Sequence, residues 1–245
     1  MSTDIRYMTL CVLLLGLRYT AVAEDADNKT WTDVAELSYV STSGNASVAT
    51  LSTKNLYTLR FAEHMTFLWK LEALKGKSDG ALTAERYFTD LRLEHAYSQR
   101  AYTYVNTGWM SDTFAGVDKH VNIGLGGGYK FLDGPQSYFK TEAGISKVNE
   151  VYTDNTDRSF AEGRVFGEYV RAFTKKNKFS QSLEYLHDFD TSTNYRYNSE
   201  TALTAVMADN FSLKVSYLIK FDNEPTPSTL HNKDTVFSTA IVANF

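Results

Sequence analysis

The sequence has little cysteine, little proline and no long apolar run. Cys11 is its only cysteine and lies in a segment that we expect to be removed, so disulfide frameworks, thiol catalysis and cysteine-ligated metals are excluded for the mature chain. Only three prolines interrupt the backbone, which leaves long stretches free to pair in sheets. The formal net charge is −4, and a chain without a basic excess is not expected to bind nucleic acid.

Residues 1–23 have the layout of a secretory signal peptide. A basic residue precedes an apolar run over 8–17, and a small-x-small site follows at 21–23. The run is too short to cross a bilayer as a helix, which needs about 20 apolar residues. We therefore expect cleavage after Ala23, a short periplasmic segment over 24–32 and a membrane domain over 33–245.

Alternation of apolar and polar residues fills the rest of the chain. The mean hydropathy is −0.33, yet 14% of the residues are aromatic, which fits a membrane barrel because only every second strand residue has to be apolar. Alternate residues of a strand point to opposite faces. The pattern predicts an all-β fold, a transmembrane antiparallel up-and-down barrel with strands near 33–42, 47–62, 65–76, 85–98, 101–111, 119–132, 137–149, 160–173, 178–188, 194–208, 211–222 and 234–245.

The connections between these segments are alternately short and long. Longer polar links are expected at 77–84, 112–118, 150–159, 188–193 and 223–233. Short periplasmic turns and longer outer loops are typical of outer-membrane barrels. We therefore predict that both termini are periplasmic and that the number of strands is even, about twelve.

The last predicted strand ends on an aromatic residue. Apolar and small or polar residues alternate from Asp234 to Phe245, as in the closing strands of outer-membrane barrels, so we expect the barrel-assembly machinery to recognise this strand. Aromatic residues also gather at the predicted strand ends, where their rings favour the headgroup zone. The expected surroundings are outer-membrane lipid and lipopolysaccharide.

Short motifs along the chain point to one family. They are residues 42–45 (Thr-Ser-Gly-Asn), Trp69, residues 112–116 (Asp-Thr-Phe-Ala-Gly), residues 124–129 (Gly-x-Gly-x-Gly-Tyr), Asp234-Thr235 and Phe245. In these the chain resembles the salt-induced outer membrane proteins, a YdiY-like family of unknown function. The resemblance implies an outer-membrane barrel of a Gram-negative bacterium and a link to salt or envelope stress, and it supplies no catalytic residues.

The inward positions of the predicted strands are rich in charge of both signs. Charges away from water must pair or line a wet pore. The predicted lumen-lining residues are Lys70, Glu72, Arg86, Asp90, Arg92, Glu94, Lys140, Glu142, Glu162, Arg164, Glu168, Arg196, Glu200, Lys214 and Lys220. The leading hypothesis is a passive pore for small polar solutes or ions. A closed structural or adhesive barrel is the alternative.

An outer-membrane hydrolase is the second alternative. His120 and His187, the latter beside Asp188, are candidate bases, but no compact nucleophile–base pair accompanies them. The glycines of residues 124–128 lack the helix and acidic partner of a dinucleotide site, and we expect them to permit strand bending or close packing. No catalytic, metal or cofactor site is predicted.

Overall fold

The computed structural model describes residues 30–42, 48–225 and 231–245. They form β1 (Trp31–Thr42), β2 (Val48–Ala62), β3 (Met65–Ser78), β4 (Ala81–Ala96), β5 (Ala101–Asp112), β6 (Val117–Asp133), β7 (Ser137–Tyr152), β8 (Asp157–Ala172), β9 (Asn177–Asp188), β10 (Tyr195–Ala208), β11 (Phe211–Asp222) and β12 (Lys233–Asn244). The described part holds one short 3-10 helix, η2 (Thr113–Ala115), and no helix there is long and apolar enough to span a membrane.

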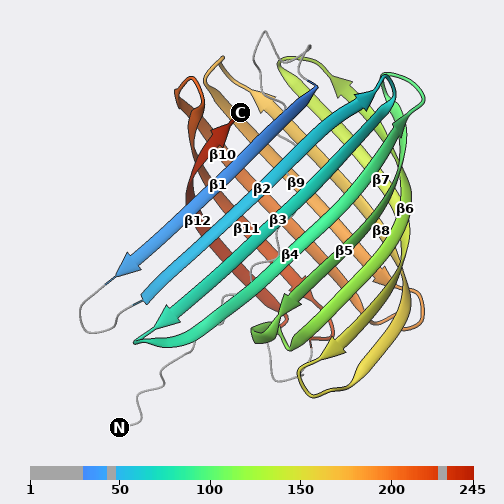
Figure 1. Cartoon of the computed structure of the whole chain (residues 1–245), viewed down its shortest axis with the longest axis vertical. Coiled ribbons are helices and arrows are strands. Elements are labelled where there is room, and N and C mark those ends of the chain that lie inside the picture. Colours follow the sequence, from blue (N-terminus) through green and yellow to red (C-terminus); the bar gives the residue numbers. More distant parts are fainter. Residues whose placement is uncertain (1–29, 43–47, 226–230) are drawn as a thin grey trace.

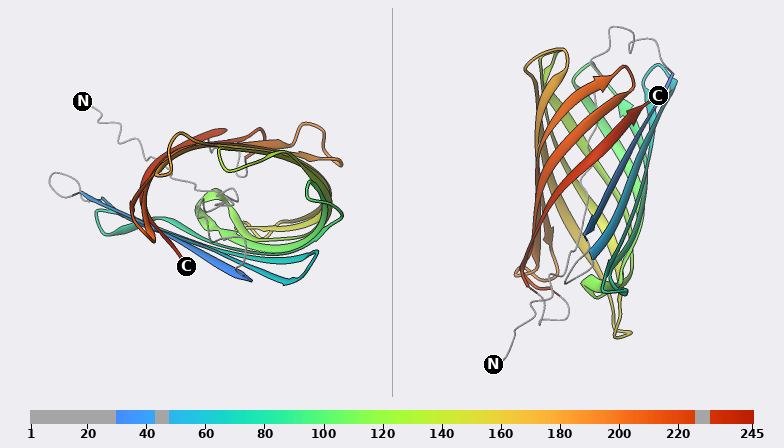
Figure 2. Two further views of the ribbon diagram at one scale, coloured as in Figure 1. Left: turned by 90° about the horizontal axis from the view of Figure 1, so that it is seen from above. Right: turned by 90° about the vertical axis from the view of Figure 1, so that its left-hand side faces the viewer.

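The twelve strands close into one barrel (Figure 1). Each strand pairs antiparallel with the next along the chain, and β12 pairs antiparallel with β1. The predicted antiparallel barrel of about twelve strands is thus confirmed. Seen along its axis, the ring is oval rather than round (Figure 2).

The two ends of the barrel differ in what they carry. Val34 near the start of β1 lies opposite Asn244 at the end of β12, so the first and last strands begin and end at the same rim. We call this rim the termini end. The opposite rim, which carries the β1–β2, β3–β4 and β5–β6 connections, is the loop end.

The two faces of the wall differ in polarity. Large apolar side chains such as Ile123, Leu125 and Val165 are more than half exposed on the outer face, whereas charged residues such as Glu168 and Lys214 are almost fully buried on the inner face. Trp69 also lies on the outer face, and its Nε1 donates to Thr89 Oγ1 at 3.0 Å, so the indole N–H is satisfied within the protein. An apolar outside around a charged inside is the pattern of a barrel in lipid.

The expected long link over 77–84 is wrong. β3 and β4 continue to Ser78 and from Ala81, and a two-residue turn at Asp79-Gly80 joins them. Both turn residues have positive φ, 49° and 81°, as the tight hairpin turn with matching twist requires. Charged residues such as Lys77 indicated a loop, but they belong to strands whose outer face is polar near the loop end.

Two further links are shorter than expected. Within 112–118 the chain forms η2 and enters β6 at Val117, and within 150–159 only residues 153–156 lie between strands. At the other boundary, β1 starts at Trp31, inside the segment expected to precede the barrel. The proposed signal peptide and the first loop, Ser43 to Asn45, lie outside the described residues.

Candidate functional site

The inner wall of the barrel carries the candidate site. Alternation along each strand turns the sequence-predicted charged residues to buried or half-buried positions. The structure gathers them in four clusters along the wall, each built from three or more strands. Each cluster is named by the residue at its centre.

The Glu142 cluster binds three cations to one carboxylate. Arg92 on β4 donates to Glu142 on β7 through both terminal nitrogens, at 3.0 and 2.9 Å. Lys140 and Arg164 donate to the same carboxylate at 3.0 and 2.9 Å, and Tyr102 Oη donates at 2.6 Å. Bidentate, charge-assisted bonds of this kind are the strong ones, so Glu142 ties β4, β5 and β8 to β7.

Glycines on β6 and β7 make this cluster possible. Tyr102 and Tyr104 on β5 lie directly opposite Gly128 and Gly126. A Cβ atom on Gly126 would lie 2.5 Å from Tyr104 Oη, and one on Gly144 would lie 2.6 Å from it. The tyrosine rings therefore lie flat over the glycines and reach the strands beyond. The close packing that we expected at the glycines of residues 124–128 is therefore observed.

The tyrosines orient the arginines as well. The guanidinium of Arg92 lies 3.6 Å from the centre of the Tyr104 ring, and Tyr104 Oη accepts from Arg164 at 3.3 Å. Arg164 also donates to Glu184 at 2.6 Å and lies 4.8 Å from the Phe166 ring. Cation–π contacts stabilise such ions where water is scarce. The predicted lumen-lining residues did not include these two tyrosines. Alternation along β5 nevertheless places its even-numbered residues, Tyr102 and Tyr104 among them, on the inner face.

The Glu150 cluster lies nearer the loop end. Arg196 on β10 contacts Glu150 on β7 at 3.3 Å and Glu162 on β8 at 2.5 Å. Glu150 also accepts from Tyr152 Oη at 2.7 Å and is 2.8 Å from His120 Nδ1. Sequence reasoning missed Glu150 because it assigned this residue to a loop.

The Glu36 cluster lies beside the junction of β1 and β12. Lys214 on β11 is 3.2 Å from Glu36 on β1 and 2.9 Å from Glu200 on β10. Lys54 on β2 lies 3.8 Å from Glu36. Lys214 reaches across β12, whose inner face there carries Ala240 and Val242, so this cluster links both sides of the junction.

The Arg86 cluster occupies β3, β4 and β5. Arg86 is 3.4 Å from Glu72 and 3.7 Å from Asp112, and Asn106 donates to Asp90 at 3.0 Å. Of the other predicted residues, Glu94 pairs with Arg92 and Glu168 with Lys140. The structure places Lys70 opposite Asp90, and Lys220 opposite Asp234.

An apolar cluster interrupts the charged wall. Leu74, Ala84, Leu218 and Val236 are buried together, and they join the β3–β4 pair to the β11–β12 pair. β1 and β2 separate these pairs in the sheet. Together with the buried Phe166, this cluster makes the interior of the barrel partly apolar.

The candidate hydrolase residues do not form a catalytic pair. His187 and Asp188 are consecutive on β9 and point to opposite faces. The Asp188 carboxylate is bound by Arg158 and Asn194. His120 contacts only an acid, Glu150, among the hydrogen bonds of the described chain. The absence of an enzymatic activity stays a prediction.

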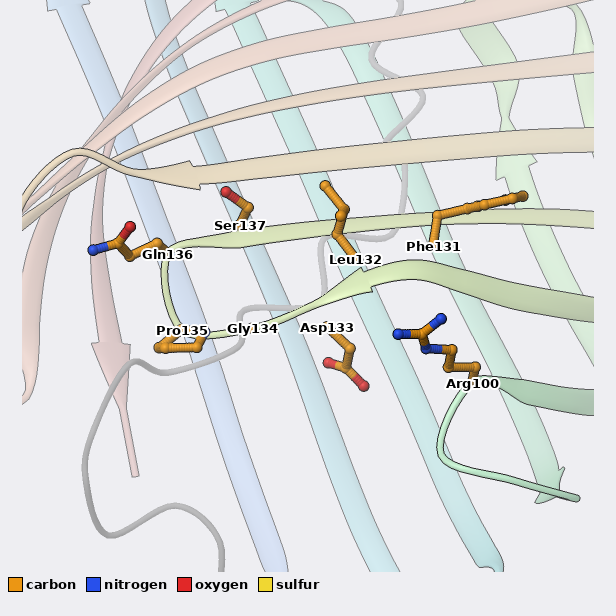
Figure 3. A pocket seen from close by; sticks show the side chains of 8 residues that line it. All are labelled: Arg100, Phe131, Leu132, Asp133, Gly134, Pro135, Gln136 and Ser137. Carbon is orange, nitrogen blue, oxygen red and sulfur yellow. The ribbon is translucent and has the colours of Figure 1, made fainter.

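A shallow pocket of about 400 Å³ lies at the termini end, at the turn between β6 and β7 (Figure 3). Arg100 and Asp133 face each other across part of it. The pocket contains no member of the four wall clusters, so it forms no part of the candidate site. Its lining residues are Arg100, Phe131, Leu132, Asp133, Gly134, Pro135, Gln136 and Ser137.

Comparison with known sequences assigns the family. The model of the protein family of unknown function DUF481 matches residues 35–245. The chain belongs to this family. Its sequence is also 28% identical over 198 residues to the uncharacterized protein YdiY of Escherichia coli K12, covering 80% of this chain and 76% of that protein. The resemblance inferred from the short motifs is thereby confirmed.

Comparison with solved structures gives the fold class of this DUF481 member. The COG4313 outer membrane channel of Pseudomonas putida F1 matches with a TM-score of 0.54 and 9% identity, covering 88% of this chain and 95% of that one. The translocator domain of the autotransporter NalP of Neisseria meningitidis matches with a TM-score of 0.53 and 8% identity, covering 90% of each chain. The fold is that of outer-membrane β-barrels.

Proposed function

We propose that this protein is a passive pore of the outer membrane for small polar solutes or ions, with both termini in the periplasm. The charged inner wall of a twelve-stranded ring carries the proposal. Barrels of about 8 strands are filled by side chains, whereas those of about 16 hold an aqueous channel. A ring of intermediate size with ionic walls is suited to a narrow wet path. The fold shared with an outer membrane channel supports the same reading.

The wall chemistry predicts weak selectivity. Each cluster holds acids and bases in contact: Glu142 with Arg92, Glu150 with Arg196, and Glu36 with Lys214. Among the described residues, these paired charges form no ring of a single sign, and such a ring is what selects cations or anions in other pores. We therefore expect cations and anions to pass at similar rates.

Single-channel recording in planar bilayers tests the pore. We expect discrete conductance steps and a reversal potential near zero in a salt gradient. Leu218→Ala thins the apolar cluster and should raise the conductance, whereas Leu213→Ala, on the outer face of the same strand, should leave it unchanged. A folded barrel that never conducts would reject the pore.

A closed structural barrel is the second candidate. The apolar cluster that joins β3 and β4 to β11 and β12 favours it, because this cluster narrows the lumen at one level. The ion pairs would then hold the wall together rather than line a path. Silence of both the native protein and Leu218→Ala in the same recordings would favour this function.

Partners and regulation follow from the proposed location. We propose contacts with outer-membrane lipid and lipopolysaccharide, and assembly through the strand that ends in Phe245. The main chain of this residue exchanges two hydrogen bonds with Asp33, at 2.9 and 3.2 Å, and so completes the ring. A link to salt or envelope stress stays a prediction, which measurement of expression at high salt would test.

A further inference from the structure

The junction of β1 and β12 is the shortest ladder in the barrel. Its register covers four positions, from Val34 opposite Asn244 to Leu37 opposite Ile241. Every other neighbouring pair of strands registers at least eleven. The rest of β1 is still a strand, because its ladder with β2 runs on to Thr42. Beyond Leu37, β1 and β12 diverge toward the loop end (Figures 1 and 2).

A side chain marks the place where the ladder stops. Ser38 Oγ donates to the carbonyl oxygen of Thr239 at 2.7 Å. Had the register continued, the N–H of Tyr39 would have donated to this oxygen. The serine satisfies one acceptor at the end of the ladder, and the edges of β1 and β12 then separate.

The diverging tip of β1 and β2 carries exposed apolar side chains on both faces. Tyr39 and Leu51 are 64% and 46% exposed on the outer face. Val40 and Val48 belong to the inner face by alternation, yet they are 49% and 37% exposed. Inner-face residues before the divergence, such as Val34, are buried. The inner face of this tip is therefore open to the surroundings of the barrel.

The apolar cluster lies behind this gap. Leu74 lies opposite Ser52, and Ser52 lies opposite Ser38, where the ladder ends. Val236, on the other side, belongs to the diverging part of β12, next to Leu218. The apolar cluster thus borders the stretch of wall in which β1 and β12 are no longer paired.

We propose that the β1–β12 junction is a lateral gate through which a single-chain amphiphile passes between the lumen and the outer leaflet. The acyl chain lies against Leu74, Leu218 and Val236, and the polar head stays beside the hydroxyls of Ser38 and Ser52. The apolar cluster has only four side chains, and one of them is an alanine. An apolar surface of this size matches one acyl chain and is too small for a lipid with two. This path leaves through the wall and does not depend on conduction along the axis.

Closing the gate by a disulfide tests the proposal. Continuing the register would place residues 40 and 238 opposite each other on the inner face, at a non-hydrogen-bonded position where the Cα separation suits a disulfide. Val40→Cys with Ser238→Cys, in a Cys11→Ser background, is reconstituted into vesicles that contain a fluorescent lysophospholipid. The readout is the rate at which this probe leaves the inner leaflet, before and after oxidation.

We expect the reduced protein to accelerate probe transfer over protein-free vesicles, and oxidation to abolish the acceleration while ion conductance is retained. Val34→Cys with Asn244→Cys is the matched control, because these residues are already paired and their disulfide should leave transfer unchanged. Transfer that is equal before and after oxidation overturns the proposal, as does a folded protein whose cysteines at 40 and 238 never oxidise.

A second variant keeps the proposal testable if the cysteine pair fails to fold. Val236→Asn places an amide at the inner side of the gap and leaves the β1–β12 ladder intact. Loss of probe transfer with unchanged ion conductance is expected. Transfer at the native rate contradicts the amphiphile path, and loss of conductance alone would count against the pore and not against the gate.

Discussion

The contact between glycine and tyrosine in the wall gives the sharpest prediction, made with Gly128→Ala. A Cβ atom on Gly128 would lie 2.5 Å from Tyr102 Oη and 2.7 Å from its Cε2, so the ring has to move. Overpacking of this kind costs about 1–3 kcal/mol. Displacing the ring also breaks the 2.6 Å hydrogen bond to Glu142, and bonds to charged groups contribute about 1.5–3 kcal/mol. We expect a loss of about 3–5 kcal/mol in the free energy of unfolding.

Gly127→Ala is the matched control. It makes the same change one residue earlier on the same strand, where the nearest atom to an added Cβ is 3.6 Å away. We expect a change within about 1 kcal/mol, in the stabilising direction, because glycine inside a strand is costly. Urea titration of the barrel in vesicles, followed by tryptophan fluorescence, gives both free energies.

A double variant separates packing from backbone effects. In a Tyr102→Ala background the ring is absent, so Gly128→Ala should then cost little. The coupling between the two sites is the difference between the two costs of Gly128→Ala. Equal losses for Gly127→Ala and Gly128→Ala, or no coupling to Tyr102, would refute the role assigned to the glycines.

Three further predictions concern the wall, a turn and the last strand. Glu142→Gln leaves three cations around a neutral amide and should lower the free energy of unfolding by about 3–5 kcal/mol in urea titration. Its control is Glu63→Gln on an exposed turn, which should change this free energy by less than about 0.5 kcal/mol. Gly80→Ala forces an L residue to a φ of 81° and should cost about 1–2 kcal/mol in the same titration, while Gly134→Ala, with nothing nearer than 3.8 Å to an added Cβ, should be neutral. Deleting Phe245 should slow the appearance of the folded band on unheated gels, and a normal rate would contradict its role in closing the ring.

The alternation of residue types was sufficient to predict the barrel. β11 was placed at Phe211–Asp222, as observed, because its apolar and polar residues alternate almost without exception. The ends of β3 and β4 were harder to place. Lys75, Lys77 and Glu85 lie on their outer face near the loop end, where the strands no longer show the apolar alternation of a lipid-facing surface.

The clusters of the inner wall could be predicted only in part. Alternation identifies which charged residues face inward, and it placed Arg92 and Glu142 on the inner face. It does not show that they meet, since 50 residues and two strands separate them. Their contact depends on the rings of Tyr102 and Tyr104 lying over glycines of the next strand, which is a property of packing and not of one strand's pattern. The short β1–β12 ladder leaves no signature within either strand.

The three tryptophans allow the most direct test of the account. Trp31, Trp69 and Trp109 all lie on the outer face and are 47%, 40% and 38% exposed. If the apolar outer face contacts lipid, brominated acyl chains will quench most of the tryptophan fluorescence of the reconstituted protein, and a water-soluble quencher such as iodide will have little effect. Efficient quenching by iodide with none by brominated lipid would contradict an apolar exterior in the membrane around an ionic interior.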